Sequence, residues 1–315
     1  MIGDLPRPLM PRALRPGVRV AIVSPCGPVL DHDLLDRGIG LLRSWGLQVV
    51  EGRHARTSTG HLAGTDDQRV HDLNAAIADP DIRAVWVTRG GYGLTRILDR
   101  VDWPALAADP GVIVGFSDVS ALLAAAWRRI GLITVHGPFV GRLAAEPREV
   151  RDQVRAVVFG GGHEPLAGAP MAGTPRQRVR APLIGGNLSV LAALAGTPDQ
   201  LDANGCVVLL EDVGEAPYRV DRLLTQLRQS GSLDGVLGVA VGSPVRCEPP
   251  PSRPSATFAD VLVDRLGDLG VPVVTDLPIG HMAAQRAVLH GGEITIDSGE
   301  GSVATHARLP VTPVA

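Results

Sequence analysis

The chain has 315 residues, with 30 basic and 33 acidic side chains and a net charge of −3, which gives no reason to expect a nucleic acid or an anionic membrane as a partner. All the basic side chains are arginines, scattered along the chain. A hydrophobic content of 45% favours folded elements joined by tight turns, despite 38 glycines and 26 prolines. The three widely spaced cysteines match neither a disulfide framework nor a metal-binding pattern.

The start of the chain and its hydropathy pattern bear on where the protein works. Residues 1–6 contain an acid and prolines, where a secretory signal would carry basic residues followed by an apolar core. No apolar run approaches the length that crosses a bilayer. Neither a dinucleotide-binding nor a P-loop glycine motif occurs. We therefore expect a cytoplasmic protein that uses no cofactor and no metal, and that binds neither membrane nor nucleic acid.

Strand-like and helix-like runs alternate over residues 17–159. Apolar runs predict strands at 18–23, 47–50, 84–87, 112–114 and 133–135. Apolar residues at helical spacing predict helices at 31–45, 65–79, 121–127 and 147–159. Strands that are almost continuously apolar and alternate with helices imply a parallel sheet covered on both faces. We predict an open α/β domain over residues 1–160.

A stretch rich in glycine, proline and alanine, 161–182, separates the two halves, and we interpret it as an interdomain linker. Residues 183–315 then form the second domain. Its predicted helices lie at 188–194, 218–229 and 258–269, and its predicted strands at 206–210, 236–241, 273–274, 287–290 and 293–296. Several short strands with fewer helices indicate a smaller mixed α/β domain.

The turn at Ser117 is the candidate site that stands out in the first half. Ser117 lies between the predicted strand 112–114 and the predicted helix 121–127, where a serine projects its hydroxyl outward. The free N–H groups at the start of the helix point at any negative charge that develops beside it. This is the outline of a nucleophile elbow. The alternative is that Ser117 or Ser120 is only a helix N-cap.

A serine nucleophile needs a base, and three histidines are candidates for that role. His136 ends the last predicted strand of the first domain, near Ser117 in any doubly wound sheet. His281 lies in a loop just after Gly280, and His290 lies within an alternating strand pattern. A lone loop histidine is more often an ordinary surface residue. The residues alone therefore leave the choice of base open.

Acidic residues and a glycine-rich turn complete the candidate site. Glu211 directly follows an apolar strand, where a charge is expected to have a partner or a function. Asp212 and Glu215 look like solvated acids at the entry to a helix. The turn at 89–93, Arg-Gly-Gly-Tyr-Gly, is a weak match to a phosphate cradle. It also lets a backbone N–H approach a substrate oxygen closely.

Six motifs occur in order along the chain: Arg89-Gly90-Gly91-Tyr92-Gly93, Gly115-Phe116-Ser117-Asp118, His136-Gly137-Pro138, Gly185-Gly186-Asn187-Leu188, Leu210-Glu211-Asp212-Val213-Gly214-Glu215 and Gly280-His281. Together they resemble the LD-carboxypeptidase family, the murein tetrapeptide carboxypeptidases, whose relatives include the microcin C self-immunity peptidases. The resemblance spans about residues 18–296. Each motif is weak by itself, whereas six in this order are specific. Phe116 stands where the family often has tyrosine.

The resemblance implies both a fold and a reaction. The first domain would be a class I glutamine amidotransferase-like sheet and the second a swivelling β/β/α-type domain, in a homodimer that uses no metal. Ser117 would be the nucleophile, His281 the general base and then the general acid, and Glu211 the carboxylate that orients the imidazole. The implied enzyme is a serine carboxypeptidase that cleaves the L,D amide bond to the terminal D-alanine of murein tetrapeptides during peptidoglycan recycling.

Further residues have implied roles in binding. The N–H groups of Asp118 and of Gly91, or of its neighbour Gly90, would form the oxyanion hole. Arg89 is a candidate for binding the substrate's terminal carboxylate, and His136 is a further candidate for substrate binding. The nearer alternative function is an immunity-type peptidase that cleaves an aminoacyl- or peptidyl-nucleotide. The remote alternative is a ligand-binding protein without catalytic activity.

Overall fold

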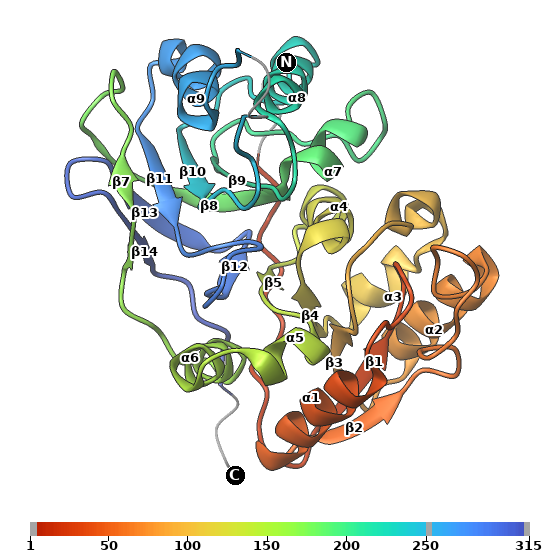
Figure 1. Ribbon diagram of the computed structural model, residues 1–315. Helices are drawn as coiled ribbons and strands as arrows, with labels where there is room; N and C mark the ends of the chain where they lie inside the picture. Colours follow the sequence, from red (N-terminus) through yellow and green to blue (C-terminus); the bar gives the residue numbers. More distant parts are fainter. Residues whose placement is uncertain (1–4, 250–253, 312–315) are drawn as a thin grey trace.

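The computed structural model describes residues 5–249 and 254–311. Residues 1–4, 250–253 and 312–315 lie outside this part. Two sheets dominate the described chain, and α4 (Ser120–Ile130) lies between them (Figure 1). Among the described residues, no helix has both the length and the apolar character needed to span a membrane.

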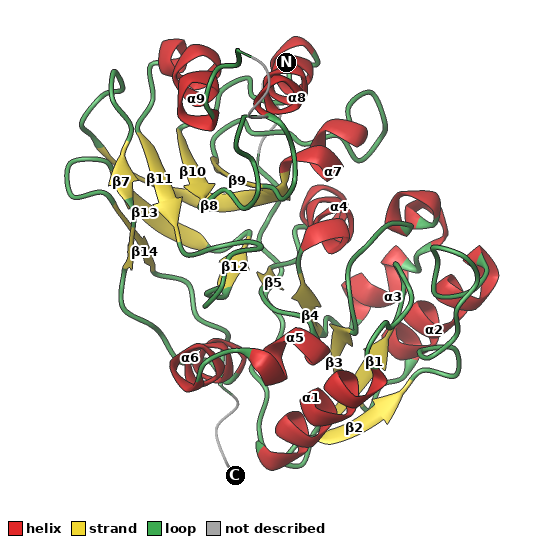
Figure 2. Ribbon diagram, in the orientation of Figure 1, coloured by secondary structure: helices red, strands yellow, loops and turns green. Residues whose placement is uncertain are grey.

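The first sheet contains the predicted parallel strands and has the order β12-β5-β4-β3-β1-β2, where β12 is Val288–His290. Its parallel strands are β1 (Arg19–Val23), β2 (Gln48–Glu51), β3 (Ile82–Val87), β4 (Val112–Gly115) and β5 (Thr134–His136). Helices cover both faces (Figure 2): α1 (His32–Ser44) and α5 (Val140–Ala145) lie on one, and α2 (Asp66–Ala78), α3 (Trp103–Ala108) and α4 on the other. The last helix of this half is α6 (Arg148–Val158).

Local sequence explains why these helices begin where they do. The Asp31 side chain accepts a hydrogen bond from the Leu34 N–H and so caps α1. Thr65 and Gln68 form a reciprocal capping box at the start of α2. At its other end α4 stops at Gly131, whose φ of 68° is left-handed and costs a glycine little. Caps of this kind fix the turns that follow the strands.

The second sheet has eight strands in the order β6-β14-β13-β8-β9-β10-β11-β7. Its parallel centre consists of β8 (Arg178–Asn187), β9 (Val207–Glu211), β10 (Gly238–Gly242) and β11 (Val273–Leu277). The antiparallel remainder consists of β6 (Leu166–Ala167), β7 (Ala169–Pro170), β13 (Glu293–Asp297) and β14 (Ser302–Thr305). Its helices are α7 (Leu188–Ala193), α8 (Pro217–Gln229) and α9 (Phe258–Leu266). The molecule is therefore a mixed α/β protein with a parallel sheet and a second sheet.

Strand β9 shows how the second sheet is buried on both faces. Val208 and Leu210 belong to the large core beneath the helices, whereas Val207 and Leu209 belong to a separate core on the other face. Alternation of this kind follows from the two-residue period of a strand. Because both faces are covered, the sequence of β9 is continuously apolar until it reaches Glu211.

Two segments differ from the sequence prediction. The expected linker 161–182 contains β6 and β7, which lie at the two edges of the second sheet, and the start of β8. The strand β12 (Val288–His290), expected in the second domain, pairs antiparallel with β5 of the first sheet. The glycines and prolines of 161–182 suggested a flexible connection, but short edge strands tolerate both residue types.

The two halves are joined by buried polar contacts as well as by the chain itself. The Ser120 hydroxyl accepts a hydrogen bond at 2.9 Å from the backbone N–H of Asn187, the last residue of β8. A Cβ atom at Gly186, whose φ is 142°, would approach Ser120 Oγ to 2.4 Å. Only a glycine therefore lets β8 come this close to the start of α4. This contact places the carboxyl end of β8 beside the Ser117 turn.

Candidate active site

Ser117 lies on a strained turn between β4 and α4. It is the first residue of a short 3-10 helix, Ser117–Val119, and its φ of 60° is unusual for a residue other than glycine. Such strain at a strand-to-helix turn is typical of a nucleophile elbow. The hydroxyl is therefore held at the carboxyl edge of the first sheet. The N-cap alternative does not describe this side chain, since Ser117 caps no helix here.

Glu211 is the final residue of β9 and is 2% exposed. Next to it, Asp212 is 5% exposed and accepts hydrogen bonds from the Asn187 amide at 3.1 Å and the Ser189 hydroxyl at 2.7 Å. The expectation that Asp212 is a solvated helix-entry acid is therefore wrong. Its carboxylate also accepts the backbone N–H of Ser189 at 2.9 Å, one of the N–H groups that the start of α7 leaves unpaired, and so holds that helix end in place.

His281 follows β11 in a loop and joins the other two side chains. Its Nδ1 lies 2.7 Å from Glu211 Oε2, and its Nε2 lies 3.2 Å from Ser117 Oγ. A Cβ atom at the preceding Gly280, whose φ is 103°, would come within 2.5 Å of the Glu211 carboxylate. A glycine is thus required for the loop to pass the acid closely. The order of groups is hydroxyl, imidazole, carboxylate, as a serine hydrolase needs.

The electrostatics of Glu211 favour a negative carboxylate at this position. Burial by itself raises the pKa of Glu211, but the hydrogen bond and charge of His281, together with smaller contributions from His136 and Asn187, hold that pKa below its usual value. An ionised Glu211 accepts the Nδ1–H of His281 and leaves Nε2 as the acceptor that faces Ser117. The arrangement therefore gives the serine hydroxyl a base that is already oriented.

The glycine-rich turn at 89–93 lies against the nucleophile. A Cβ atom at Gly90 would come within 3.0 Å of Ser117 Oγ and 2.7 Å of the Phe139 ring, so the backbone itself fills this space. Gly91 has a φ of 115° and packs on Gly27. Asp118 points its carboxylate away, into the protein, where it accepts the Leu94 N–H at 3.0 Å. The turn thus brings peptide groups next to the reacting hydroxyl.

The two residues expected to bind substrate lie in different surroundings. Arg89 is partly buried, and its guanidinium donates to the Pro28 carbonyl at 3.2 Å and lies beside Gly27. It is therefore in the loop region next to the turn at 89–93. His136 is 0% exposed, at the end of β5, where Val288 is its partner on β12. A ring so enclosed cannot touch a substrate that arrives from solvent, which argues against the expected substrate contact.

His136 and His290 are buried histidines whose titration should govern acid stability. Burial lowers the pKa of His136 to about 4 and that of His290 to about 3, from an ordinary value of 6.5. Below pH 6.5 these histidines bind protons in the unfolded chain but stay neutral in the folded one. The free energy of unfolding therefore falls as the pH falls, until the pH reaches the pKa values of the folded state. Between pH 7.5 and 5.0 each histidine should reduce the free energy of unfolding by about 2 kcal/mol.

Urea unfolding at these two pH values tests this expectation with the variant His290→Gln. In the native chain His290 Nε2 accepts the Gly185 N–H at 3.0 Å, and a glutamine oxygen can take over that role. Between pH 7.5 and 5.0 the free energy of unfolding should fall by roughly 2 kcal/mol less in the variant than in the wild type, because only His136 still contributes. An unchanged difference between pH 7.5 and 5.0 would mean that His290 does not control this stability.

Two features of the site had no distinctive signal in the sequence. The Phe116 ring lies 4.8 Å from the His281 ring and stacks on Phe139 at 4.3 Å. Arg142 and Glu146 contact the loop that carries His281. An Arg–Glu pair four residues apart is a common helix-surface pattern, so its spacing did not reveal that it faces another domain.

One group of side chains in the described part of the chain has the composition of a metal site. Potential ligand atoms of His54, His71 and Asp72 all lie within 4.8 Å of one another. The Asp72 carboxylate already accepts the His54 backbone N–H at 2.6 Å and lies 3.3 Å from His71 Nδ1. None of these residues belongs to the Ser117, His281 and Glu211 group. We therefore assign them no part in its chemistry.

Comparisons with known proteins identify the family to which the chain belongs. The family model of the LD-carboxypeptidase N-terminal domain matches residues 20–137, and that of the C-terminal domain matches residues 180–296. A carboxypeptidase-type protein of Streptomyces coelicolor is 43% identical and covers 93% of this chain and 94% of its own length. The murein tetrapeptide carboxypeptidase of Pseudomonas aeruginosa is 37% identical, with 87% of this chain and 91% of its own length covered.

Solved structures have the same fold. The muramoyltetrapeptide carboxypeptidase of Oxalobacter formigenes is 30% identical, with a TM-score of 0.77 over 94% of this chain and 100% of that one. MccF, the microcin C7 self-immunity protein of Escherichia coli, has a TM-score of 0.86 in its complex with glutamyl sulfamoyl guanosine, at 22% identity, over 96% of this chain and 100% of that one. With both family models matched, the chain belongs to the LD-carboxypeptidase family and is a serine peptidase.

Proposed function

We propose that the protein is a serine carboxypeptidase that removes the terminal D-alanine from murein tetrapeptides by cleaving the L,D amide bond. The observation that carries this proposal is the continuous chain of contacts from Ser117 Oγ through the His281 imidazole to the Glu211 carboxylate. Relatives named as murein tetrapeptide carboxypeptidases support the choice of substrate. As the family resemblance implies, we assign this reaction to peptidoglycan recycling.

The proposed mechanism has two steps. Ser117 Oγ attacks the carbonyl carbon of the L,D amide while His281 Nε2 takes the hydroxyl proton, and Glu211 stabilises the imidazolium that forms. The tetrahedral intermediate then breaks its C–N bond, and His281 returns the proton to the amine of D-alanine, which leaves. A water molecule, deprotonated by His281, attacks the acyl-enzyme ester, and the shortened peptide leaves as Ser117 regains its proton.

Backbone N–H groups provide the proposed oxyanion hole. Asp118 is the second residue of a 3-10 helix, where the N–H has no helical partner, and Gly91 lies in the turn next to Ser117. We assign these two N–H groups to the oxygen of the tetrahedral intermediate. Arg89 is the proposed partner of the D-alanine carboxylate, since its guanidinium lies beside the same turn.

A single assay separates this function from its alternatives. The purified protein is incubated with a murein tetrapeptide, with the precursor that ends in D-alanyl-D-alanine, and with an aminoacyl sulfamoyl nucleotide, and products are followed by mass. We expect release of D-alanine from the tetrapeptide alone. Cleavage of the nucleotide compound alone would identify an immunity-type peptidase, as the shared fold with MccF permits. No product in any arm would favour the remote alternative of a non-catalytic binding protein.

The proposal also includes a homodimer in the cytoplasm, as the family resemblance implies. Sedimentation equilibrium of the purified chain measures the first property: a mass near twice 32.9 kDa supports it. Fractionation of cells that express the protein measures the second. A monomer, or recovery outside the cytoplasmic fraction, would remove the corresponding part of the proposal and leave the peptidase assignment standing.

A further inference from the structure

The loop that carries His281 is held by the domain that carries the nucleophile. Arg142, on α5, donates from Nη2 to the His281 carbonyl at 3.1 Å and also to the carbonyl of Met282. Its Nε donates to Glu146 Oε1 at 2.8 Å. The other oxygen of Glu146 accepts the backbone N–H of Ala284 at 3.1 Å. One ion pair thus binds three peptide groups of the loop.

Burial makes this ion pair more than a surface contact. The Arg142 side chain is 24% exposed and that of Glu146 is 6% exposed. When one partner of such a pair is removed, the other charge is left in a site with little water, which is costly. A guanidinium is also suited to this position, because its planar donors reach a carboxylate and backbone carbonyls at the same time. A lysine has one compact charge and cannot match that geometry.

The loop itself needs support from outside. Ala284 has a φ of 60°, a left-handed conformation that costs an alanine free energy. Its N–H is the group that Glu146 accepts. Further along, the Gln153 side chain on α6 exchanges two hydrogen bonds with the backbone of Ala287, at 2.8 and 2.9 Å. The first domain therefore holds the loop at both ends, and the Arg142 pair holds the end next to the imidazole.

The same guanidinium also lies against the aromatic residue next to the nucleophile. Arg142 Cζ lies 5.3 Å from the centre of the Phe116 ring, which in turn lies 4.8 Å from the His281 ring. Phe116 directly precedes Ser117. A cation over an aromatic face is attracted by the ring quadrupole. Arg142 therefore contacts both the backbone of the base and the side chain of the residue that precedes the nucleophile.

We propose that Arg142, paired with Glu146, is a positioning residue that sets the imidazole of His281 at hydrogen-bonding distance from Ser117. Arg142 touches neither the hydroxyl nor the imidazole ring nitrogens, so it acts through the loop. The proposal rests on the proposed roles of Ser117 and His281. Because the base and the nucleophile come from different domains, their distance depends on how this loop sits on α5. A displacement near 1 Å at a reacting group can cost about 10²-fold in rate.

The test compares Arg142→Ala and Arg142→Lys with the wild type in two reactions. One is hydrolysis of murein tetrapeptide, and the other is phosphonylation of Ser117 by a small fluorophosphonate, which needs the serine–histidine pair but no murein recognition. For Arg142→Ala we expect roughly 10²-fold lower kcat, KM within about threefold, and a similar loss in the phosphonylation rate. Arg142→Lys should be about tenfold faster than Arg142→Ala in both reactions, and so remain about tenfold slower than the wild type.

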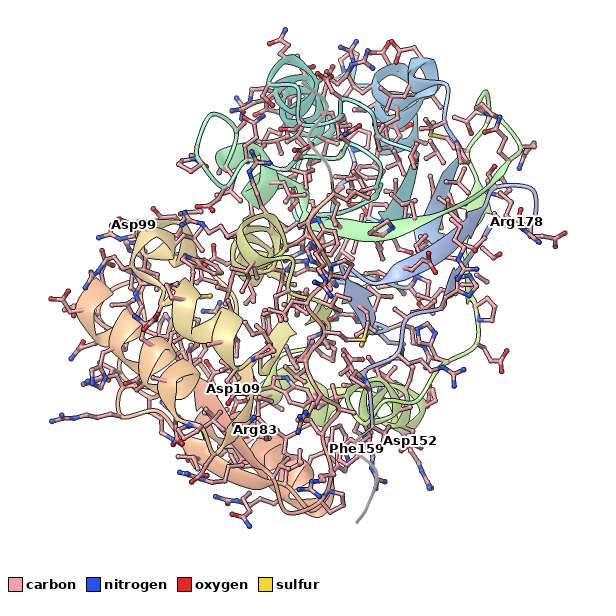
Figure 3. All side chains as sticks on the ribbon, turned by 180° about the vertical axis from the view of Figure 1, so that it is seen from behind. Arg83, Asp99, Asp109, Asp152, Phe159 and Arg178 are labelled. Atoms are coloured by element: carbon pink, nitrogen blue, oxygen red, sulfur yellow. The ribbon has the colours of Figure 1, made fainter. Side chains whose placement is uncertain are left out.

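Arg148→Ala is the matched control. Arg148 and Asp152 form an ion pair with the same four-residue spacing on α6, at 3.4 Å, with side chains 86% and 63% exposed. Asp152 lies on the outer side of α6 (Figure 3). Since an exposed pair contributes little, the control should keep both rates within about twofold of the wild type.

The outcomes separate the inference from the proposed function. Wild-type protein that is phosphonylated but leaves the tetrapeptide intact would refute the substrate assignment and still allow the phosphonylation test of Arg142. Equal phosphonylation rates for Arg142→Ala and Arg148→Ala would overturn the inference, as would a loss confined to KM. If Arg142→Ala does not fold, Arg142→Lys carries the test: about tenfold slower phosphonylation supports the inference, and the wild-type rate overturns it.

Discussion

Ser117→Ala is expected to lower kcat for the tetrapeptide by roughly 10³- to 10⁶-fold, because it removes the oxygen that forms the acyl-enzyme. The binding groups and the oxyanion turn remain, so KM should change little. His281→Ala should cause a loss of similar size. Combining the two substitutions should add little further, since nucleophile and base act as one unit. D-Alanine release, measured by mass over several hours, gives the rates.

The fold of the Ser117→Ala protein should persist, which circular dichroism and thermal unfolding check. Ser117 also has a strained φ of 60°, and alanine keeps that backbone without relieving it. Ser44→Ala is a suitable control, because Ser44 is exposed and its hydroxyl only donates to the Leu41 carbonyl. Full release of D-alanine by Ser117→Ala would defeat the assignment of the nucleophile.

Glu211→Gln is expected to lower kcat by roughly 10³- to 10⁴-fold with little change in shape. A glutamine fits the space but carries no charge to stabilise the imidazolium of His281. Its amide can also present N–H₂ in place of an oxygen to Nδ1, which would favour the wrong tautomer. Because the lowered pKa of Glu211 means that the folded protein favours the ionised carboxylate, the neutral glutamine should leave the melting temperature unchanged or lower it.

Glu215→Gln is the control for this substitution. Glu215 lies in the same loop after β9 and pairs with Arg219 at 3.6 Å, at a more exposed position. Its loss should leave kcat within about twofold, as expected for an exposed ion pair. If Glu211→Gln turned over the tetrapeptide at the control's rate, another group would have to orient His281.

Much of the fold was predictable because its signals are local. The apolar run 112–114, the turn after it and the following helix correspond to β4 and α4. The capping box at Thr65 predicted the start of α2 to within one residue. Each of these features depends on neighbours within about one turn or one strand, where side-chain period and capping act directly.

Segments whose structure depends on distant partners were not predictable. The stretch 161–182 has the composition of a linker, yet strands 100 or more residues away give β6 and β7 their pairing partners. The short β12 shows no sign in its sequence that it joins the first sheet rather than the second. Tertiary packing decides which sheet edge a short strand joins, and the sequence of a three-residue strand does not contain that information.

The site divides in the same way. Residue type and local position were enough to place a serine on a strand-to-helix turn and a carboxylate at the end of an apolar strand. They left His136, His281 and His290 as candidate bases, and family resemblance rather than pattern favoured His281. In the folded chain His281 lies 3.2 Å from Ser117 although 164 positions separate them, whereas His136 is enclosed behind β12. The contact depends on how the two sheets pack together and on how the loop that carries His281 packs on α5. The free energy of that packing is the sum of many contacts between residues far apart in the sequence, so a local pattern does not reveal it.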